Sequence, residues 1–572
     1  VTARRAIGVK WGPSAETRYI AVEDAARYRD ALGVALPPGL PQSLLKTTRE
    51  ALRDLLLRYA RTHAPFTLDE AGQRFALGRA IVREQLLRLQ AEGKLLEGAF
   101  RPGGSQREWA HAEVLRAIRQ RSLAKLRKEI EPVETAVLGR FAVHWHGLMR
   151  PRAGLDALLD AVERLQGLAL PASILEREIL PARVFNYRPD DLDALAAAGE
   201  IMWCGVEPLG ERDGRVALYL TDHFARLWAP PSVELDERET QIVQLLEARG
   251  ASFFGPLHAA VGGGYAQTTL DALFSLVWKG VVTNDTFRGL RAYTQPKNAH
   301  SQRRERRSVA RGFRSRRELP RAAEGRWSLL KSLVPQPGTQ TERANAWSQV
   351  LLHRYGLVTR EVAQAERISG GFSALYDVFK ALEDAGRIRR GYFVQGVSAM
   401  QFALPGVLEQ LRALRMPPDR PEVVALSATD PANPYGALIK WPEAAEGRAL
   451  ARAAHAVVIL VDGSLAAYLP RSAKQLQAFA PEAEPDRTRV LRAIAQRLQL
   501  LGSLSDRRGL LLSEIDGKPA HEHALAEHLK DVGFHWSSQG FYLPRDARAT
   551  VLPLTAAAEE GEGEAEDEAS DA

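Results

Sequence analysis

The chain has 572 residues, enough for roughly three to five domains of ordinary size. Hydrophobic residues make up 45% and charged residues 26%, the values of a globular protein. A membrane span and a secretory signal are not expected, because the sequence has no run of about 18 apolar residues and no apolar segment at its start. The single cysteine, Cys204, excludes an intrachain disulfide and a cysteine-based zinc site and fits a cytoplasmic location. The first residue is Val1, as expected of a fragment of something longer.

Basic residues outnumber acidic ones, with 77 Lys and Arg against 70 Asp and Glu, so the net charge is +7. The last fourteen residues hold eight acids and no base, which leaves 77 basic against 62 acidic residues, or +15, in the preceding chain. Such an excess favours an anionic partner, of which nucleic acid is the commonest. The alternative is a basic surface that serves solubility alone.

The positive charge is densest between residues 297 and 326, and its few apolar residues show no helical period. We expect a basic linker over residues 297–340, which either orders on a polyanion or acts as a solvated tether. The acidic residues 554–572 are expected to be a disordered tail, either inert or competing for the basic surface. The basic residues of the dense segment are Lys297, Arg303, Arg304, Arg306, Arg307, Arg311, Arg314, Arg316, Arg317, Arg321 and Arg326.

One order of elements recurs along the chain. An apolar-periodic helix is followed by a short helix, a second long helix that ends at glycine, and a pair of short strands rich in arginine. This is the order of a winged helix, a helix-turn-helix with a β-hairpin. The sequence therefore predicts a mainly α fold with α+β parts, in which tandem winged-helix modules precede a small α+β or β-barrel-like C-terminal module.

The pattern predicts eight segments. For each module, the alternative is a bare three-helix fold that binds protein. The segments are an N-terminal connecting segment (1–50), a winged helix (51–120), a winged-helix-like region of one or two units (121–230), a winged helix (231–296), the basic linker (297–340), a winged helix (341–415), the C-terminal α+β module (416–553) and the acidic tail (554–572).

The winged-helix pattern also predicts which residues face nucleic acid, on the second long helix and the wing of each module. The module at 341–415 is the best candidate, because its helix, its wing strand RIRRGYFV (387–394) and the preceding segment are all cationic. The helix at 189–198 is acidic, so its module is expected to be structural or to face protein. The predicted interface residues are Arg79, Arg83, Arg101, Arg107, Thr268, Arg288, Arg291, Ser373, Tyr376, Lys380, Arg387, Arg389 and Arg390.

No spacing in the sequence assigns a catalytic, metal-ligating or cofactor-binding residue. His521 and His528 share a helix face, but His523 points elsewhere and no His-Glu-x-x-His pattern occurs, so a solvated face is expected. His144-Trp145-His146 is expected to be local packing. The amide of Gln401 is expected to be structural, and Asp462, Asp516 and Asp546 are expected at turns or on the surface.

Several longer sequence segments, spread over about residues 10–545, resemble segments of the large helicase-related (Lhr) proteins of bacteria. The resemblance is to the long C-terminal region that follows the superfamily 2 motor in that DNA helicase family. The segments are RYIAVEDA (18–25), ALGVALPPGLP (31–41), EGAFRPGGSQREW (97–109), PASILEREILPARV (171–184), GGFSALYDVFKALEDAGRIRRGYFVQGVSAMQFA (370–403) and DPANPYG (430–436).

The resemblance implies a DNA-binding and assembly region of an ATP-dependent 3′–5′ DNA helicase that acts in DNA repair. Its implied partners are single-stranded or partly duplex DNA and the helicase core, with a homo-oligomer as a further hypothesis. The motor is not in this chain, because Gly93-Lys94 and Gly517-Lys518 lack the rest of the phosphate-binding loop. The family's C-terminal region is also similar to winged-helix DNA glycosylases, so a DNA (uracil) glycosylase is the alternative, although their paired-amide pattern is absent here.

Overall fold

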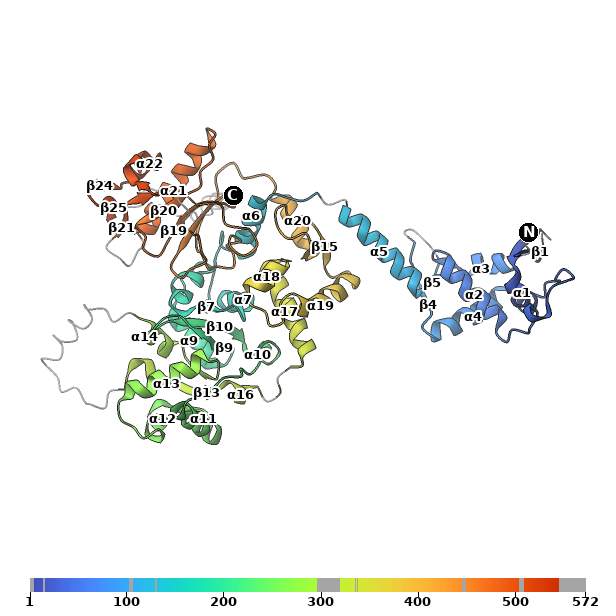
Figure 1. Ribbon diagram of the computed structural model, residues 1–572, viewed down its shortest axis with the longest axis horizontal. Coiled ribbons are helices and arrows are strands. Elements are labelled where there is room, and N and C mark those ends of the chain that lie inside the picture. Colours follow the sequence, from blue (N-terminus) through green and yellow to red (C-terminus); the bar gives the residue numbers. More distant parts are fainter. Residues whose placement is uncertain are drawn as a thin grey trace, which may run out of the picture. The chain divides into compact units, whose positions relative to one another are not determined.

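The structure, a computed structural model, describes residues 5–13, 16–101, 106–128, 131–295, 319–334, 336, 338–444, 449–503 and 509–544. It divides into two compact units, residues 1–129 and 130–572 (Figure 1). Residues 102–105, most of the dense basic segment and the acidic tail lie outside the described residues. Helices dominate and the sheets are small, which confirms the predicted mainly α fold with α+β parts. No helix in the described part of the chain is long and apolar enough to cross a membrane.

The first unit opens with a small folded element within the segment predicted as a connector. Strands β1 (Ala6–Lys10) and β2 (Thr17–Ala21) form an antiparallel hairpin, and α1 (Ala25–Leu32) follows. These elements have an apolar cluster of their own, formed by Val9, Trp11, Ile20 and Val34.

The first winged helix completes this unit. The hydroxyl of Thr67 accepts from the backbone N–H of Glu70, whose carboxylate accepts from the N–H of Thr67, so the two residues form a capping box at the start of α3. The strands pair in the order β3-β5-β4, so the last strand of the hairpin lies in the middle. Leu56, Leu86 and Trp109 join the helices and β5 in one core. The elements are α2 (Ala51–Thr62), β3 (Phe66–Thr67), α3 (Leu68–Phe75), α4 (Arg79–Ala91), β4 (Leu95–Gly98), β5 (Glu108–His111) and α5 (Ala112–Lys128).

The second unit contains three more modules with the same strand order, namely β7-β10-β9, β11-β13-β12 and β14-β16-β15. Each places the last strand of its wing between the other two strands, as the first module does. The second module consists of α7 (Leu155–Leu165), β7 (Leu170–Pro171), α8 (Ala172–Ile174), the π-helix Leu175–Ile179, α9 (Pro189–Ala198), β9 (Ile201–Pro208), β10 (Gly214–Leu220) and α10 (Thr221–Leu227); β6 (Arg152–Ala153) and β8 (Val184–Phe185) form a separate pair.

The wing of the third module differs from the pattern predicted for residues 231–296, in which a pair of short strands directly follows the second long helix. Strand β12 (Val282–Asn284) is followed by helix α14 (Arg288–Thr294), and the partner strand β13 (Arg326–Leu329) comes only after the basic segment. The basic segment therefore leaves and re-enters one sheet and does not simply link two modules. Pattern analysis missed this because the two halves of the wing are far apart in sequence. The other elements are α11 (Glu237–Arg249), β11 (Ser252–Phe253), α12 (Phe254–Ala260), α13 (Ala266–Trp278) and α16 (Leu330–Leu333).

Helix α6 (Thr135–Trp145) precedes the second module in sequence but packs with the fourth module and the C-terminal module. Its glycine allows a close approach, since a Cβ at Gly139 would lie 2.0 Å from the carbonyl oxygen of Gly463. Next to it, the guanidinium of Arg140 donates to the carbonyl oxygens of Leu414 and Asp462, at 2.8 and 2.7 Å. The fourth module consists of α17 (Gln340–Tyr355), β14 (Leu357–Val358), α18 (Arg360–Ala365), α19 (Ser373–Asp384), β15 (Arg389–Gly391), β16 (Gln401–Ala403) and α20 (Pro405–Ala413).

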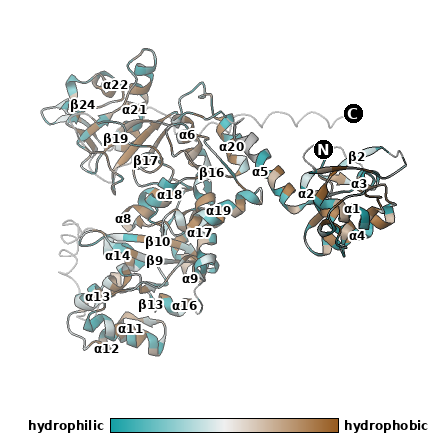
Figure 2. Ribbon diagram, turned by 45° about the vertical axis from the view of Figure 1, so that its right-hand side comes forward, coloured by the Kyte–Doolittle hydropathy of each residue, from teal (hydrophilic) through white to brown (hydrophobic). Residues whose placement is uncertain are grey.

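The C-terminal module holds two open sheets, ordered β17-β18-β19-β20-β22-β23 and β21-β25-β24. Neither closes, so the α+β prediction is correct and the barrel-like form is not found. Figure 2 shows hydrophobic residues along β17 and β19, and Figure 1 shows this module at the opposite end of the second unit from α11, α12 and α13. Its elements are β17 (Val423–Ser427), β18 (Val457–Val461), β19 (Ser464–Leu469), β20 (Gln475–Ala478), α21 (Asp486–Ser503), β21 (Gly509–Leu512), β22 (Glu514–Ile515), β23 (Lys518–Pro519), α22 (Leu525–Asp531), β24 (His535–Ser537) and β25 (Gly540–Pro544).

The close contact at Gly139 gives a stability prediction. Alanine there gains about 1 kcal/mol of helix propensity, but its methyl group forces α6 away from the turn at Gly463. We expect Gly139→Ala to lower the free energy of unfolding by about 1–3 kcal/mol, as overpacking does elsewhere. Gly255→Ala in α12 is the matched control, because a Cβ there meets nothing within 4 Å. Urea titrations of both variants measure the difference, and equal midpoints would contradict the role given to this contact.

Candidate nucleic-acid interface

The fourth module presents its predicted residues on helix α19 and the wing that follows. Leu375 and Phe379 are buried, whereas Ser373 and Lys380 are exposed on the helix and Arg387 is exposed just before β15. The side chains of Lys380, Arg387 and Arg389 make no hydrogen bond or ion pair with another described residue. These three cations are therefore available to an external anion.

Two further predicted residues of this module bind each other. Arg390 lies 3.3 Å from the buried carboxylate of Glu383 and donates to the hydroxyl of Tyr376 at 3.3 Å. This contact fixes the wing strand against α19. Arg390 thus has an intramolecular task that its sequence position did not reveal.

In the first module, three predicted arginines line one hollow of about 470 Å³ between α4 and the wing, namely Arg79, Arg83 and Arg107. Arg79 pairs with Asp69 at 3.1 Å and Arg107 lies 3.8 Å from Glu97, while Arg83 has no partner in the described chain. All three are exposed.

Arg101 has a different role. Its guanidinium contacts Glu70 at 2.9 Å and the buried Glu108 at 2.8 Å, and it also donates to the carbonyl oxygen of Pro65. Through these ion pairs and this hydrogen bond, Arg101 connects the start of α3 to the wing.

In the third module, Thr268 is exposed near the start of α13, as predicted. Beside it, Tyr265 is 87% exposed, an unusual state for an aromatic side chain in a folded protein. Aromatic rings on nucleic-acid-binding surfaces stack on unpaired bases. The pattern analysis did not select Tyr265, although the three glycines before it, Gly262–Gly264, mark the loop that displays it.

The structure contradicts the wing placement of Arg288 and Arg291, because both belong to helix α14. Arg291 pairs with Glu176 at 2.8 Å and with Asp193 at 3.0 Å, and these carboxylates belong to the second module. Burial lowers the pKa of Arg291, but the bonds to the two carboxylates outweigh it and raise the pKa overall. Arg288 pairs with Glu324 of its own module at 3.1 Å and lies 3.6 Å from Asp193 of α9. These arginines join modules, and their acidic partners in α9 and the π-helix could not be read from local pattern.

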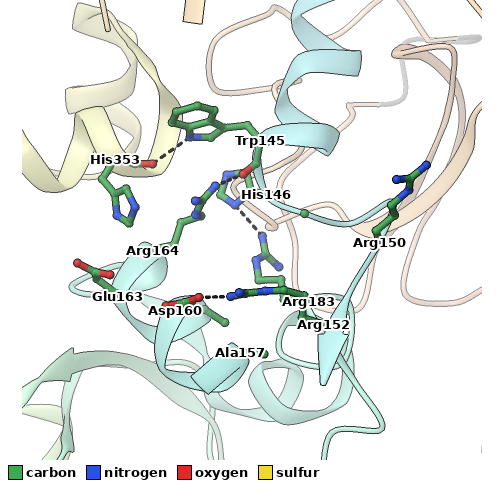
Figure 3. Close-up of a pocket in the computed structure, with 12 residues that line it drawn as sticks. Trp145, His146, Arg150, Arg152, Ala157, Asp160, Glu163, Arg164, Arg183 and His353 are labelled. Carbon is green, nitrogen blue, oxygen red and sulfur yellow. Dashed lines mark hydrogen bonds and ion pairs between the residues drawn. The ribbon is translucent and has the colours of Figure 1, made fainter. Parts of the chain in front are cut away.

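A cationic pocket of about 430 Å³ lies between the end of α6, helix α7 and α17. Figure 3 shows Trp145, Arg164 and Arg183 around His146, with Arg150 at the edge and pointing away. Arg183 forms two bonds to the carboxylate of Asp430, at 2.7 and 2.8 Å, and approaches Nδ1 of His146 at 3.3 Å. Arg164 donates to the carbonyl oxygen of Trp145 and lies over its ring.

Burial and neighbouring positive charge lower the pKa values of His146 and Arg164 in this pocket. Burial holds the pKa of His146 well below its usual value, and repulsion from Arg183 lowers it further. Burial also lowers the pKa of Arg164, again with Arg183 as the next cause. Atom Nε2 of His146 and Nε of Arg183 are buried without a hydrogen-bond partner among the described residues. A bound anionic group would relieve this repulsion, so the pocket has the electrostatics of an anion site.

The remaining candidates from the sequence are structural where the structure describes them. The amide of Gln401 accepts from the N–H groups of Phe393 and Val394 and donates to the carbonyls of Val394 and Ser398, all within 3.0 Å. Asp462 and Asp516 are turn residues with positive φ, as expected, and Asp546 lies outside the described residues. His144 bonds to Glu422, while His521 packs on Trp536. No group of three potential metal ligands occurs in the described part of the chain.

Comparison with known proteins agrees with this architecture. Models of three winged-helix domains of the large helicase-related protein match residues 1–47, 133–221 and 337–423. Two curated relatives match nearly the whole chain. One, from Mycolicibacterium smegmatis, is 38% identical over 539 residues, which are 90% of this chain and 34% of that protein. The other, from Escherichia coli, is 34% identical over 567 residues, 92% of this chain and 36% of that protein.

The chain belongs to the Lhr family. It corresponds to a C-terminal Lhr region and spans about a third of the length of the two relatives. Their names are "Lhr helicase/ probable uracil glycosylase" and "Lhr helicase/uracil glycosylase". The match at 133–221 begins just before α6, so the family's domain contains this helix together with the second module.

The pair of Arg183 and Asp430 gives a second stability prediction. Both side chains are almost fully buried, at 3% and 1% exposure, so Asp430→Asn leaves an uncompensated charge. We expect a loss of about 3–5 kcal/mol in the free energy of unfolding. Asp160→Asn removes the same charge from the exposed pair with Arg152 in the same pocket and should cost less than about 1 kcal/mol. Denaturant titration of both variants measures the two losses of unfolding free energy. Similar losses would show that burial does not determine how much the Arg183–Asp430 pair contributes to stability.

Proposed function

We propose that the chain is a DNA-binding and assembly region of an Lhr-type ATP-dependent 3′–5′ DNA helicase that acts in DNA repair in the bacterial cytoplasm. The motor would be supplied in cis by a longer protein. The observation that carries the proposal is the repeated winged-helix order, combined with free cations on the long helix or wing of the first and fourth modules. Winged helices place these two elements against the nucleic-acid backbone and grooves.

The residues that we propose for DNA binding are fewer than the net charge suggests, and they lie in separate modules. Arg83 in the first module and Lys380, Arg387 and Arg389 in the fourth have no partner in the described chain, and Tyr265 in the third is almost fully exposed. Cations of this kind neutralise phosphates, and the tyrosine suits an unpaired base. Single-stranded or partly duplex DNA is therefore the proposed ligand, and self-association of the chain remains a second hypothesis about its partners.

This surface predicts salt-dependent binding that falls with each lost cation. We expect the triple variant Lys380→Ala, Arg387→Ala, Arg389→Ala to bind all DNA sequences more weakly and to the same extent. The slope of log affinity against log salt should become smaller by up to about three, one for each phosphate contact. Fluorescence anisotropy with a labelled single strand at several salt concentrations measures both quantities.

The matched control removes three exposed cations from the C-terminal module, Arg487, Lys518 and Lys530. It has the same net charge as the first variant but leaves the fourth module intact. Equal affinity and slope in the two triple variants would show that binding depends on overall charge alone and would overturn the proposed surface.

A second candidate function is removal of a base from DNA. It is favoured by a pocket lined by Ser173 and Asp213 of the second module and by His455 of the C-terminal module, and both relatives carry the words "uracil glycosylase" in their names. Incubation of the chain with a uracil-containing strand, followed by cleavage at abasic sites, tests it. Release no greater than in buffer would reject this second function and leave the DNA-binding proposal untouched.

A further inference from the structure

The cationic pocket between the end of α6, α7 and α17 contains two buried N–H groups that lack an acceptor. They are Nε2 of His146 and Nε of Arg183, which have no hydrogen-bond partner among the described residues. Buried donors are paired in nearly all native structures, so each exception needs a physical explanation. Both residues line the pocket of about 430 Å³, and Figure 3 shows their side chains in contact. The pocket therefore offers more donors than the surrounding protein uses.

The proton of His146 is on the atom that lacks a partner. A guanidinium can only donate, so Nδ1 of His146 accepts from Arg183, 3.3 Å away. A neutral imidazole carries one proton, which is then on Nε2. Burial holds the pKa of His146 well below its usual value and keeps the ring neutral near pH 7, and it also lowers the pKa of His353, the other imidazole of the lining. His146 is thus a donor toward the pocket and not an acceptor for its neighbours.

Ion pairs within the protein use only part of the positive charge of this pocket. Arg183 and Arg152 are paired with aspartates. Arg164 donates to a backbone carbonyl oxygen, and Arg150 is exposed at the edge (Figure 3). Apart from the two pairs, the lining residues retain two arginines against the single carboxylate of Glu163. The ligand that fits this excess is an anion.

The indole ring of the pocket is not free to bind a base. The ring of Trp145 stacks on Phe141, with 5.3 Å between the ring centroids, and the guanidinium carbon of Arg164 lies 5.4 Å from the same indole centroid. Proteins that bind bases by stacking use aromatic rings that are exposed to the base. The pocket therefore suits the charged end of a nucleotide and not its base.

The distribution of burial favours a phosphate at the end of a chain. The unpartnered N–H groups are buried, whereas Arg150, Arg152 and Asp160 at the edge of the pocket are exposed. A phosphodiester within a strand continues on both sides and carries one negative charge. A terminal phosphate continues on one side only and carries a charge of about −1.5 to −2 near pH 7. Arginine binds the oxygens of such a group through several charge-assisted hydrogen bonds.

We propose that this pocket binds a terminal phosphate group, the 5′-phosphate of a DNA strand or of a free nucleotide, with Arg164 and Arg150 as its charge partners. The N–H groups of His146 and Arg183 lie behind these side chains and stabilise the same negative charge. The volume is within the range of small-molecule sites and leaves room for the sugar that carries the phosphate. This site goes beyond the DNA-binding residues proposed above, which belong to other modules and do not distinguish a strand end.

The first test compares two single strands of one sequence, labelled at the 3′ end, with a 5′-phosphate or a 5′-hydroxyl group. In fluorescence anisotropy with the full chain, we expect the phosphorylated strand to bind about 10–100-fold more tightly, the effect of a hydrogen bond to a charged group. Arg164→Gln should remove most of this preference, because the amide can still donate to the carbonyl oxygen of Trp145 but carries no charge. Arg164→Lys, which keeps the charge, should retain part of it.

Two further variants separate the pocket from general effects. Arg150→Gln changes only an exposed side chain at the edge of the pocket and should reduce the preference about 2–5-fold, as expected of an exposed ion pair. Arg188→Gln is the matched control, since Arg188 is an exposed arginine of the second module outside the pocket, and it should keep the whole preference. Affinity for the hydroxyl-ended strand should be unchanged in all four variants, which shows that each is folded.

The second test separates the two sources of the phosphate. Thymidine 5′-monophosphate and thymidine are titrated into the chain in a calorimeter. Binding of the nucleotide but not the nucleoside, with equal affinity for the two strands, supports the site and assigns it to a free nucleotide. A preference for the phosphorylated strand without nucleotide binding supports the site and assigns it to a DNA end. In both cases Arg164→Gln should abolish the effect.

The site and the proposed DNA-binding function fail in different ways. A chain that binds neither strand would overturn the DNA-binding function, whereas the nucleotide titration would still test the pocket. Equal affinity for the two strands together with no nucleotide binding would overturn the phosphate site and leave the DNA-binding function intact. A preference for phosphate that is unchanged in Arg164→Gln and Arg150→Gln would place the phosphate elsewhere and would also overturn the site.

Discussion

The ion pair between Arg183 and Asp430 sets how the second module and the C-terminal module meet. Two buried charges are costly to remove from water, and only close, bidentate bonding offsets this cost. The pair satisfies that condition, with both bonds below 3 Å. Arg183 lies in the segment PASILEREILPARV (171–184) and Asp430 in the segment DPANPYG (430–436), two of the segments that carry the family resemblance. Their pairing fixes one wall of the cationic pocket and holds the loop of His455 beside the second module.

Other buried polar contacts also connect the modules of the second unit, so these modules do not fold as independent bodies. The fully buried Arg354 of α17 pairs with Glu366 at 2.5 Å and donates to the carbonyl oxygen of Arg164 at the end of α7. Thr283 of the third module donates to the carbonyl oxygen of Trp203 in the second at 2.6 Å. The second and third modules also share one apolar core. Such contacts hold winged helices in fixed relative positions, as a continuous binding surface requires.

Local sequence features predicted the elements well wherever the interaction itself is local. The turns at Asp462 and Asp516 depend on residues a few positions apart, and both are as expected. The wing of the third module was mispredicted, because β12 finds its partner strand only beyond the basic segment. The packing of α6 on the turn at Gly463 could not be predicted either, because no periodic pattern in the sequence indicates a contact between residues more than 300 positions apart.

The sequence also fails to show which residues of the candidate site can contact a ligand. Net charge counts arginines but does not show which of them already have a carboxylate partner. Arg101, Arg288, Arg291 and Arg390 fit the predicted positive surface by sequence alone, yet each is paired within the protein. Arg83, Lys380, Arg387 and Arg389 also fit that surface, but they form no ion pair with a described residue. A guanidinium that holds two modules together cannot be released to a phosphate without breaking that contact. If the proposed function is correct, affinity for DNA depends on the small set of cations without a described partner, whereas the larger paired set stabilises the modules and the contacts between them.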